Sequence, residues 1–100
     1  MPSAPSHRTQ ITFVHSPACH FCEDAAAALD EFAARYPLEI TTVELESPAG
    51  AALVARHHPA MNPLVVVDGE FFSSGRLPRK KLARLLERHA DAAVAVAEAR

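Results

Sequence analysis

The sequence lacks a disulfide framework, a membrane-spanning run and a signal peptide. Only two of its 100 residues are cysteines, and no apolar stretch approaches the length needed to cross a bilayer. Residues 1–8 contain none of the apolar core that a signal peptide requires. We therefore expect a cytoplasmic protein that does not bind membranes. In such a reducing compartment, a close cysteine pair is more often catalytic or metal-binding than structural.

The sequence also has no large excess of positive or negative charge. Ten Lys and Arg residues stand against twelve Asp and Glu residues, for a net charge of −2. This balance does not provide the basic surface that nucleic acid requires, so we expect no nucleic-acid partner. Apolar residues make up 49% of the chain, enough for one buried core. The sequence thus predicts one domain over residues 9–90, with a flexible leader at 1–8 and a helical extension at 91–100.

Hydrophobic periodicity predicts elements in the order β-α-β-α-β-β-α. Strands are expected over residues 10–15, 38–45, 64–67 and 70–72, and helices over 22–36, 48–57 and from 78 to the C-terminus. Ser47 and Pro48 are a typical N-cap and first residue of a helix. Asp68-Gly69 indicates a tight hairpin between the last two strands, whereas the helix between the first two makes them parallel. The fold class is therefore α/β, with a mixed four-stranded sheet flanked by helices.

Cys19 and Cys22 stand where the first strand pattern gives way to the first helical pattern. Two thiols at this spacing can close a small disulfide, and a helix N-terminus offers unpaired backbone N–H groups and positive partial charge to the first sulfur. These groups favour the thiolate of Cys19, the form that attacks disulfides. The helix places Cys22 one turn along on the inner face. We therefore predict a redox site, with Cys19 as the attacking thiol and Cys22 as the less accessible resolving thiol.

A metal site is the alternative use of these cysteines. Zinc or copper could be ligated by two thiolates and two imidazoles, those of Cys19, Cys22, His15 and His20. However, His20 lies inside the Cys-x-x-Cys turn, where simultaneous tetrahedral ligation is sterically awkward. We therefore expect no metal ion. His20 could instead stabilise the neighbouring thiolate or point to solvent, and the sequence leaves both roles open.

Basic residues gather where the last helix is expected to begin. This basic cluster consists of Arg76, Arg79, Lys80 and Lys81. Cations at a helix N-terminus oppose the helix dipole, and an anionic ligand or an acidic partner would relieve this cost. A solvated basic edge would need no partner, because single surface charges contribute little to stability. Both interpretations stay open.

The Cys-x-x-Cys at a strand-to-helix junction is followed by Asn62-Pro63 directly before a buried strand and a hairpin. In this order the motifs resemble the thioredoxin superfamily, and most of all its small glutaredoxin-like members, over residues 9–90. The resemblance implies a thioredoxin-like fold of glutaredoxin size and a thiol-disulfide oxidoreductase that needs no bound cofactor. Cys19 and Cys22 would be its catalytic residues. The Asn62-Pro63 bond would be cis and lie against them.

The resemblance also implies partners and a substrate surface. Substrates would be disulfide-containing proteins or low-molecular-weight thiols, and an external thiol or a reductase would donate the electrons. The residues expected to bind substrate are His20, Phe21, Asn62, Pro63, Ser74, Gly75 and Arg76.

Several positions depart from the pattern of these families. Glutaredoxins that use glutathione commonly carry a lysine where this chain has Ser16, and an acidic segment where it has the basic Arg76. Thioredoxins have a buried acid and a tryptophan where this chain has Phe13 and Ala18. Tight glutathione recognition is therefore not expected. The alternative functions are a Cys/His metal carrier and a thioredoxin-like docking module without catalysis.

Overall fold

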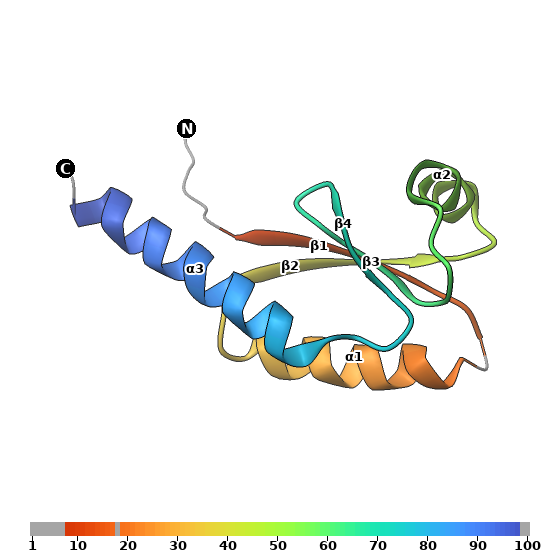
Figure 1. Cartoon of the computed structure of the whole chain (residues 1–100), viewed down its shortest axis with the longest axis horizontal. Helices are drawn as coiled ribbons and strands as arrows, with labels where there is room; N and C mark the ends of the chain where they lie inside the picture. The colour runs from red at the N-terminus through yellow and green to blue at the C-terminus, as the bar shows by residue number, and fades with distance from the viewer. Residues whose placement is uncertain (1–7, 18, 99–100) are drawn as a thin grey trace.

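The secondary-structure elements follow one another in the order predicted from the sequence (Figure 1). The computed structural model describes residues 8–17 and 19–98, and for 91–98 it describes the backbone alone. Its elements are β1 (Thr9–His15), α1 (His20–Ala33), β2 (Leu38–Glu44), α2 (Pro48–His57), β3 (Leu64–Val67), β4 (Glu70–Ser74) and α3 (Arg79–Glu98). The strands and α2 begin and end within two residues of their predicted bounds.

The strands form one mixed sheet in the order β2-β1-β3-β4. β1 runs parallel to β2 along its whole length and antiparallel to β3. β3 and β4 are antiparallel and meet in the predicted hairpin, where Asp68 and Gly69 have φ angles of 50° and 84°. Positive φ at both central residues is what a two-residue turn between twisted strands requires. The mixed four-stranded sheet predicted from the sequence is therefore confirmed.

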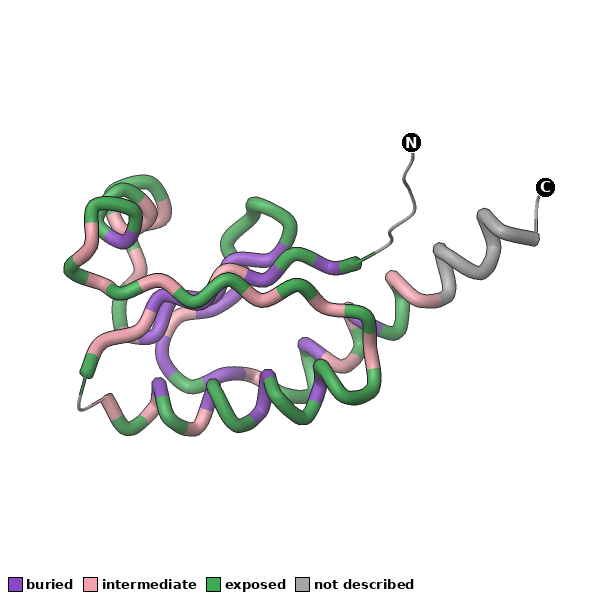
Figure 2. Tube along the Cα trace, turned by 180° about the vertical axis from the view of Figure 1, so that it is seen from behind, coloured by how far each residue is buried: buried purple, intermediate pink, exposed green. Residues whose placement is uncertain are grey.

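Helices cover both faces of this sheet (Figure 1). α1 and α3 pack on one face, and the short α2 packs on the other. The larger core lies beneath α1 and α3 and includes Ile11, Phe13, Leu29, Val65, Leu82 and Leu86. A smaller core of Val14, Leu64 and Val66 lies on the face that α2 covers. Because β1 and β3 contribute to both cores, buried residues concentrate in these strands and on the inner side of α1 (Figure 2).

α1 starts two residues earlier than predicted and also ends earlier. Cys19 is its N-cap, with an extended backbone, and the Cys19 sulfur accepts a hydrogen bond from the N–H of Cys22. Cysteine is not among the residues that usually cap helices, so the sequence prediction placed the start too late. At the other end, the N–H of Tyr36 bonds to the carbonyl of Phe32 in a closing turn. The helix therefore finishes well before Pro37.

α3 is a single helix of 20 residues that carries the chain away from the sheet (Figure 1). In its middle, His89 Nδ1 lies 3.0 Å from Oγ1 of the buried Thr9 at the start of β1. Residues 91–98 of the predicted extension continue this helix. Residues 1–7 and 99–100, which include most of the predicted leader, lie outside the described residues. Within the described ranges, no helix is both long and apolar enough to span a bilayer.

Gly50 is buried in the first turn of α2, where the chain leaves β2. A Cβ at this position would overlap the carbonyl oxygen of Glu44 and lie 2.7 Å from that of Leu45. Backbone atoms cannot move aside as a flexible side chain can, so we expect Gly50→Ala to lower the free energy of unfolding by roughly 1–3 kcal/mol. Urea unfolding followed by circular dichroism measures this change.

The matched control for this variant is Ala51→Gly, the reverse substitution at the exposed next position. It should cost only about 1 kcal/mol, the usual difference in helix propensity. If propensity alone mattered, Gly50→Ala would stabilise the protein. An unchanged or increased free energy of unfolding for Gly50→Ala would therefore contradict the close approach of α2 to the end of β2.

Candidate functional site

Cys19 and Cys22 form a disulfide at the start of α1, with their Cα atoms 5.1 Å apart. Cys19 is half-exposed. Cys22 lies on the inner face of the helix, within the larger core, and is 5% exposed. The order of accessibility is the predicted one, because the first sulfur belongs to a residue at the surface and the second to a residue of the core.

The first turn of α1 is organised around the sulfur of Cys19. The backbone N–H of Cys22 donates a hydrogen bond to Cys19 Sγ over 3.2 Å. This N–H is one of the donors that a helix leaves free at its N-terminus, where partial positive charge favours an anion. When the disulfide is open, the same donor can stabilise a thiolate on Cys19. The support for the thiolate thus comes from the backbone of the helix itself.

The two histidines near the cysteines belong to different elements. His20 is the first residue of α1 and is exposed, next to the half-buried Phe21. His15 ends β1, and its ring stacks on Phe13 with the ring centroids 5.6 Å apart. In the part of the chain that the structure describes, no three His, Cys, Asp or Glu side chains gather as metal ligands.

The second part of the predicted site is built around Asn62 and Pro63. The peptide bond between them is cis, as the resemblance implies. Pro63 is fully buried and Asn62 half-buried, and the Pro63 carbonyl accepts a hydrogen bond of 3.0 Å from the N–H of Gly75. Gly75 is buried with φ at 83°, a conformation that favours glycine, while Ser74 before it is half-buried and Arg76 after it is exposed. The fold thus joins Gly75 to the Asn62-Pro63 segment.

Met61 is a neighbour of this segment that the sequence did not predict. Its side chain is 53% exposed, and among the described residues Met61 and Phe71 are the large apolar residues that are exposed. Its sulfur lies 3.3 Å from the position that a Cβ would take at Gly75. The only signal in the sequence is its place directly before Asn62-Pro63.

One member of the basic cluster at the start of α3, Arg79, is paired with acidic residues of the same chain. Arg79 Nη2 lies 3.0 Å from Asp24 Oδ1, and Arg79 Nη1 lies 3.6 Å from Glu31 Oε1. The charge of this arginine therefore bridges α3 to two carboxylates of α1. Arg79 thus has acidic partners within the chain, in ion pairs that are exposed to solvent. Arg76 and Lys80 are exposed, and for them the interpretation as contacts for an anionic partner stays open.

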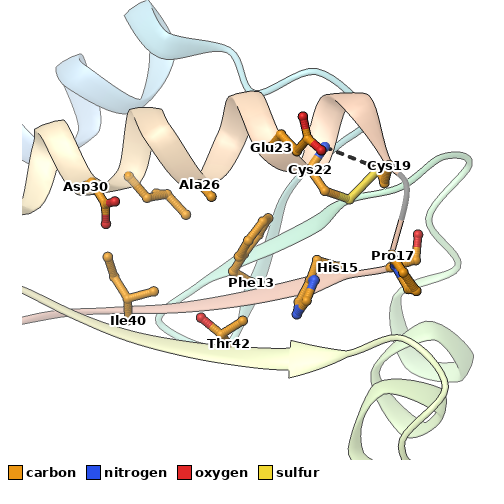
Figure 3. A pocket seen from close by; sticks show the side chains of 12 residues that line it. Phe13, His15, Pro17, Cys19, Cys22, Glu23, Ala26, Asp30, Ile40 and Thr42 are labelled. Atoms are coloured by element: carbon orange, nitrogen blue, oxygen red, sulfur yellow. Dashed lines mark hydrogen bonds between the residues drawn. A yellow bond between two sulfur atoms is a disulfide. The ribbon is translucent and has the colours of Figure 1, made fainter.

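A cavity beside the disulfide is a feature that the sequence did not predict (Figure 3). It measures about 350 Å³ and lies between α1 and the strands β1 and β2. Cys19 and Cys22 both line it. None of the predicted substrate-binding residues does. The lining comes from three elements with no shared sequence pattern, so only the folded arrangement brings it together.

Comparison with solved structures shows which fold this is. A mutant thioredoxin from Halobacterium salinarum NRC-1 is similar with a TM-score of 0.64 and 16% identity, over 81% of this chain and 74% of that chain. A malarial protein is similar with a TM-score of 0.58 and 14% identity, over 82% and 97% of the two chains. A thioredoxin from Thermus thermophilus is similar with a TM-score of 0.52 and 20% identity, over 81% and 72%.

No family model and no curated protein matches the sequence. At these identities the structural likeness shows the fold. The chain therefore has a thioredoxin-like α/β fold. Its first helix starts with a Cys-x-x-Cys pair, an arrangement that supports a redox function.

The exposures of the two cysteines predict their reactivity after reduction. We expect iodoacetamide to modify Cys19 roughly ten times faster than Cys22, because Cys19 is accessible and its sulfur accepts the N–H of the buried Cys22. Brief alkylation of the reduced protein followed by peptide mass spectrometry measures the ratio. In urea, where the helix is lost, the two rates should converge. Faster modification of Cys22 in the folded protein would reverse the assigned order.

Proposed function

We propose that the protein is a thiol-disulfide oxidoreductase whose Cys19–Cys22 couple alternates between disulfide and dithiol. The observation that carries the proposal is the position of the pair, an accessible sulfur at the N-cap of α1 and a buried one a turn along, in a thioredoxin-like fold. A helix start supplies the donors that a reactive thiolate needs. The couple itself carries two electrons, so the reaction requires no further cofactor.

In the reducing direction, the thiolate of Cys19 attacks one sulfur of the substrate disulfide. A mixed disulfide forms, and the other substrate sulfur leaves with the electron pair and takes a proton. Cys22, having lost its proton, then attacks the sulfur of Cys19, which closes the intramolecular bond and releases the remaining substrate sulfur as a thiol. The substrate gains two electrons and two protons. An external thiol or a reductase returns the pair to the dithiol form.

In this proposal, a substrate binds beside the segments of Asn62, Pro63 and Gly75, where Asn62, Ser74 and Arg76 reach the surface. The hydrogen bond from Gly75 to the Pro63 carbonyl supports it, because this bond holds the two segments together. The positive φ of Gly75, which favours glycine, turns the chain at this point. We assign the remaining predicted contacts to the border of the surface, namely His20, Phe21, Ser74 and Arg76. The partners would be disulfide-containing proteins or small thiols in a reducing compartment such as the cytoplasm.

Replacing each of the two cysteines should impair disulfide reduction in a different way. We expect Cys19→Ser to abolish disulfide reduction, because no attacking thiolate remains. Cys22→Ser should instead accumulate a mixed disulfide with the substrate, because only the second thiol can release it. Turnover with a disulfide-bonded protein and dithiothreitol, together with mass spectrometry of the adducts, measures both effects. Retained turnover in Cys19→Ser would remove the basis of the mechanism.

Thermal unfolding under reducing conditions is the control for this pair of variants. Both substitutions exchange sulfur for oxygen at nearly constant size, so neither should prevent folding. A variant that unfolds near the temperature of the reduced parent protein and lacks activity has lost chemistry, not structure.

The exposed Arg76 predicts a charge preference for substrates. We expect Arg76→Ala to slow association with an acidic disulfide-bonded peptide roughly twofold, with the loss shrinking as salt concentration rises. Stopped-flow mixing of the reduced protein with the peptide measures the rate. Arg79→Ala is the matched control, because that charge is already paired with Asp24. If the association rate falls equally in the two variants, Arg79 interacts with the substrate despite its pairing with Asp24, and the expected difference between the two arginines is wrong.

A further inference from the structure

The lining of the cavity beside the disulfide follows α1 from Cys19 to Asp30, about three turns of helix. Figure 3 shows Glu23 beside the cysteines and Asp30 at the other end, where its carboxylate points from α1 towards Ile40. Glu23 and Asp30 are both exposed. The cavity is therefore a long site with an acidic group near each end.

The positions of Glu23 and Asp30 on α1 determine how far apart these acidic groups lie. Asp30 follows Glu23 by seven positions, which places both on one side of the helix with their Cα atoms about 10 Å apart. Helical side chains tilt towards the N-terminus of their helix, so the two carboxylates keep a similar separation. Carboxylates that share a metal ion each lie within about 2.6 Å of it, so this pair cannot ligate one ion together. A ligand that engages both must carry two cationic groups on one chain.

The stretch of lining between the two carboxylates is largely apolar. Ala26 lies between them on α1 (Figure 3). Phe13 and Leu29 are buried in the lining, and the half-buried Ile40 adds to it from β2. Apolar side chains of this kind favour contact with methylene groups, because both are then removed from water. The middle of the cavity therefore suits a carbon chain.

The two carboxylates differ from the other acids of α1. Asp24 and Glu31 follow them directly in the sequence but pair with an arginine of α3. None of the ion pairs found among the described residues includes Glu23 or Asp30. No Lys or Arg is among the described residues that line the cavity. His15 lines it as well, but even with a protonated imidazole there the lining would remain net negative.

We propose that this cavity binds a linear polyamine, with one terminal ammonium group at Glu23, the other at Asp30 and the carbon chain over Ala26 and Ile40. A volume of about 350 Å³ is the size of a small-molecule site and too small for an extended peptide. An extended chain advances by about 1.25 Å per bond, so seven methylene groups between two nitrogens span about 10 Å. Spermidine is of similar length. The ligand thus matches the separation of the two carboxylates.

The polyamine site does not overlap the residues expected to contact a disulfide substrate. Asn62, Pro63 and Gly75 are not part of the lining. Binding of a polyamine transfers no electrons, so the inference goes beyond the proposed oxidoreductase function and does not depend on it.

The test compares amines that differ in length and in number of charges. Isotope-labelled protein in the disulfide form is titrated with each amine, and the amide NMR signals of Ile40 and Thr42 report binding. Heptamethylenediamine has the matching length. Heptylamine has the same carbon chain with one ammonium group, and putrescine has both charges on a shorter chain. We expect heptamethylenediamine to bind roughly two- to fivefold more tightly than either, and by less at high salt. Spermidine should bind at least as tightly.

Four variants assign this preference to the cavity. Glu23→Gln and Asp30→Asn should each remove the advantage of heptamethylenediamine over heptylamine, because only one ion pair remains. Glu39→Gln is the matched control. It removes the same charge from the other face of β2, where Glu39 accepts a hydrogen bond from Gln10, and should leave the advantage intact. Ala26→Lys should weaken the binding of all the amines, because it adds a competing ammonium group to the site. The same spectra show whether each variant keeps the fold.

Equal affinities for heptylamine and heptamethylenediamine, or tighter binding of putrescine, would overturn the bridging of Glu23 and Asp30. An equal loss of the advantage in Glu39→Gln would show that it follows the net charge of the protein, and would also overturn the site. Amide shifts caused by a lysine-containing peptide but by none of the amines would assign the cavity to a protein ligand and overturn the polyamine. The proposed function would stand in each of these cases, because its test measures the reduction of disulfides.

Discussion

The pairing of β1 with β2 on one side and with β3 on the other determines where the site forms. Because β2 is parallel to β1, the chain must cross over between them, so α1 begins at the carboxyl end of β1 and carries Cys19 there. Because β3 is antiparallel to β1, β3 starts at this same end, directly after Asn62 and Pro63. β4 returns there and delivers Gly75. Three segments far apart in the sequence thus lie at the same end of the sheet.

The elements could be predicted from the sequence because their signals are local. The buried run 64–67, the Asp68-Gly69 turn and the Ser47 cap each depend on a few neighbouring residues, and each lies where the sequence placed it. The start of α1 could not be predicted in this way. Its cap is the sulfur of Cys19, and the preferences used to find helix starts describe oxygen acceptors. The motif predicts a redox site, but it does not predict that Cys19 ends the loop as the N-cap of α1.

Contacts between distant segments could not be predicted from spacing or periodicity. Arg79 reaches Asp24 across 55 residues, and nothing in the basic cluster marks it as the member that is paired internally. The cavity likewise depends on how far α1 stands from β2, which follows from the side chains packed between them and from no single segment. Met61 lies beside the predicted residues through its contact with Gly75, and that contact exists only in the folded chain. The Cys-x-x-Cys motif could therefore be identified in the sequence, while the residues that surround it in the fold could not.

The hydrogen bond from the Cys22 N–H to the Cys19 sulfur couples the first turn of α1 to the redox state of the pair. A thiolate accepts such a bond more strongly than a disulfide sulfur does, so the cap is stronger in the dithiol form. Coupling of this kind is reciprocal. The first turn of α1 stabilises the thiolate, and reduction of the disulfide stabilises the first turn by the same free energy. A change that frays this turn therefore makes the protein a stronger reductant, and one that tightens it makes the protein a stronger oxidant. The balance between the disulfide and the dithiol form thus depends in part on the stability of a helix.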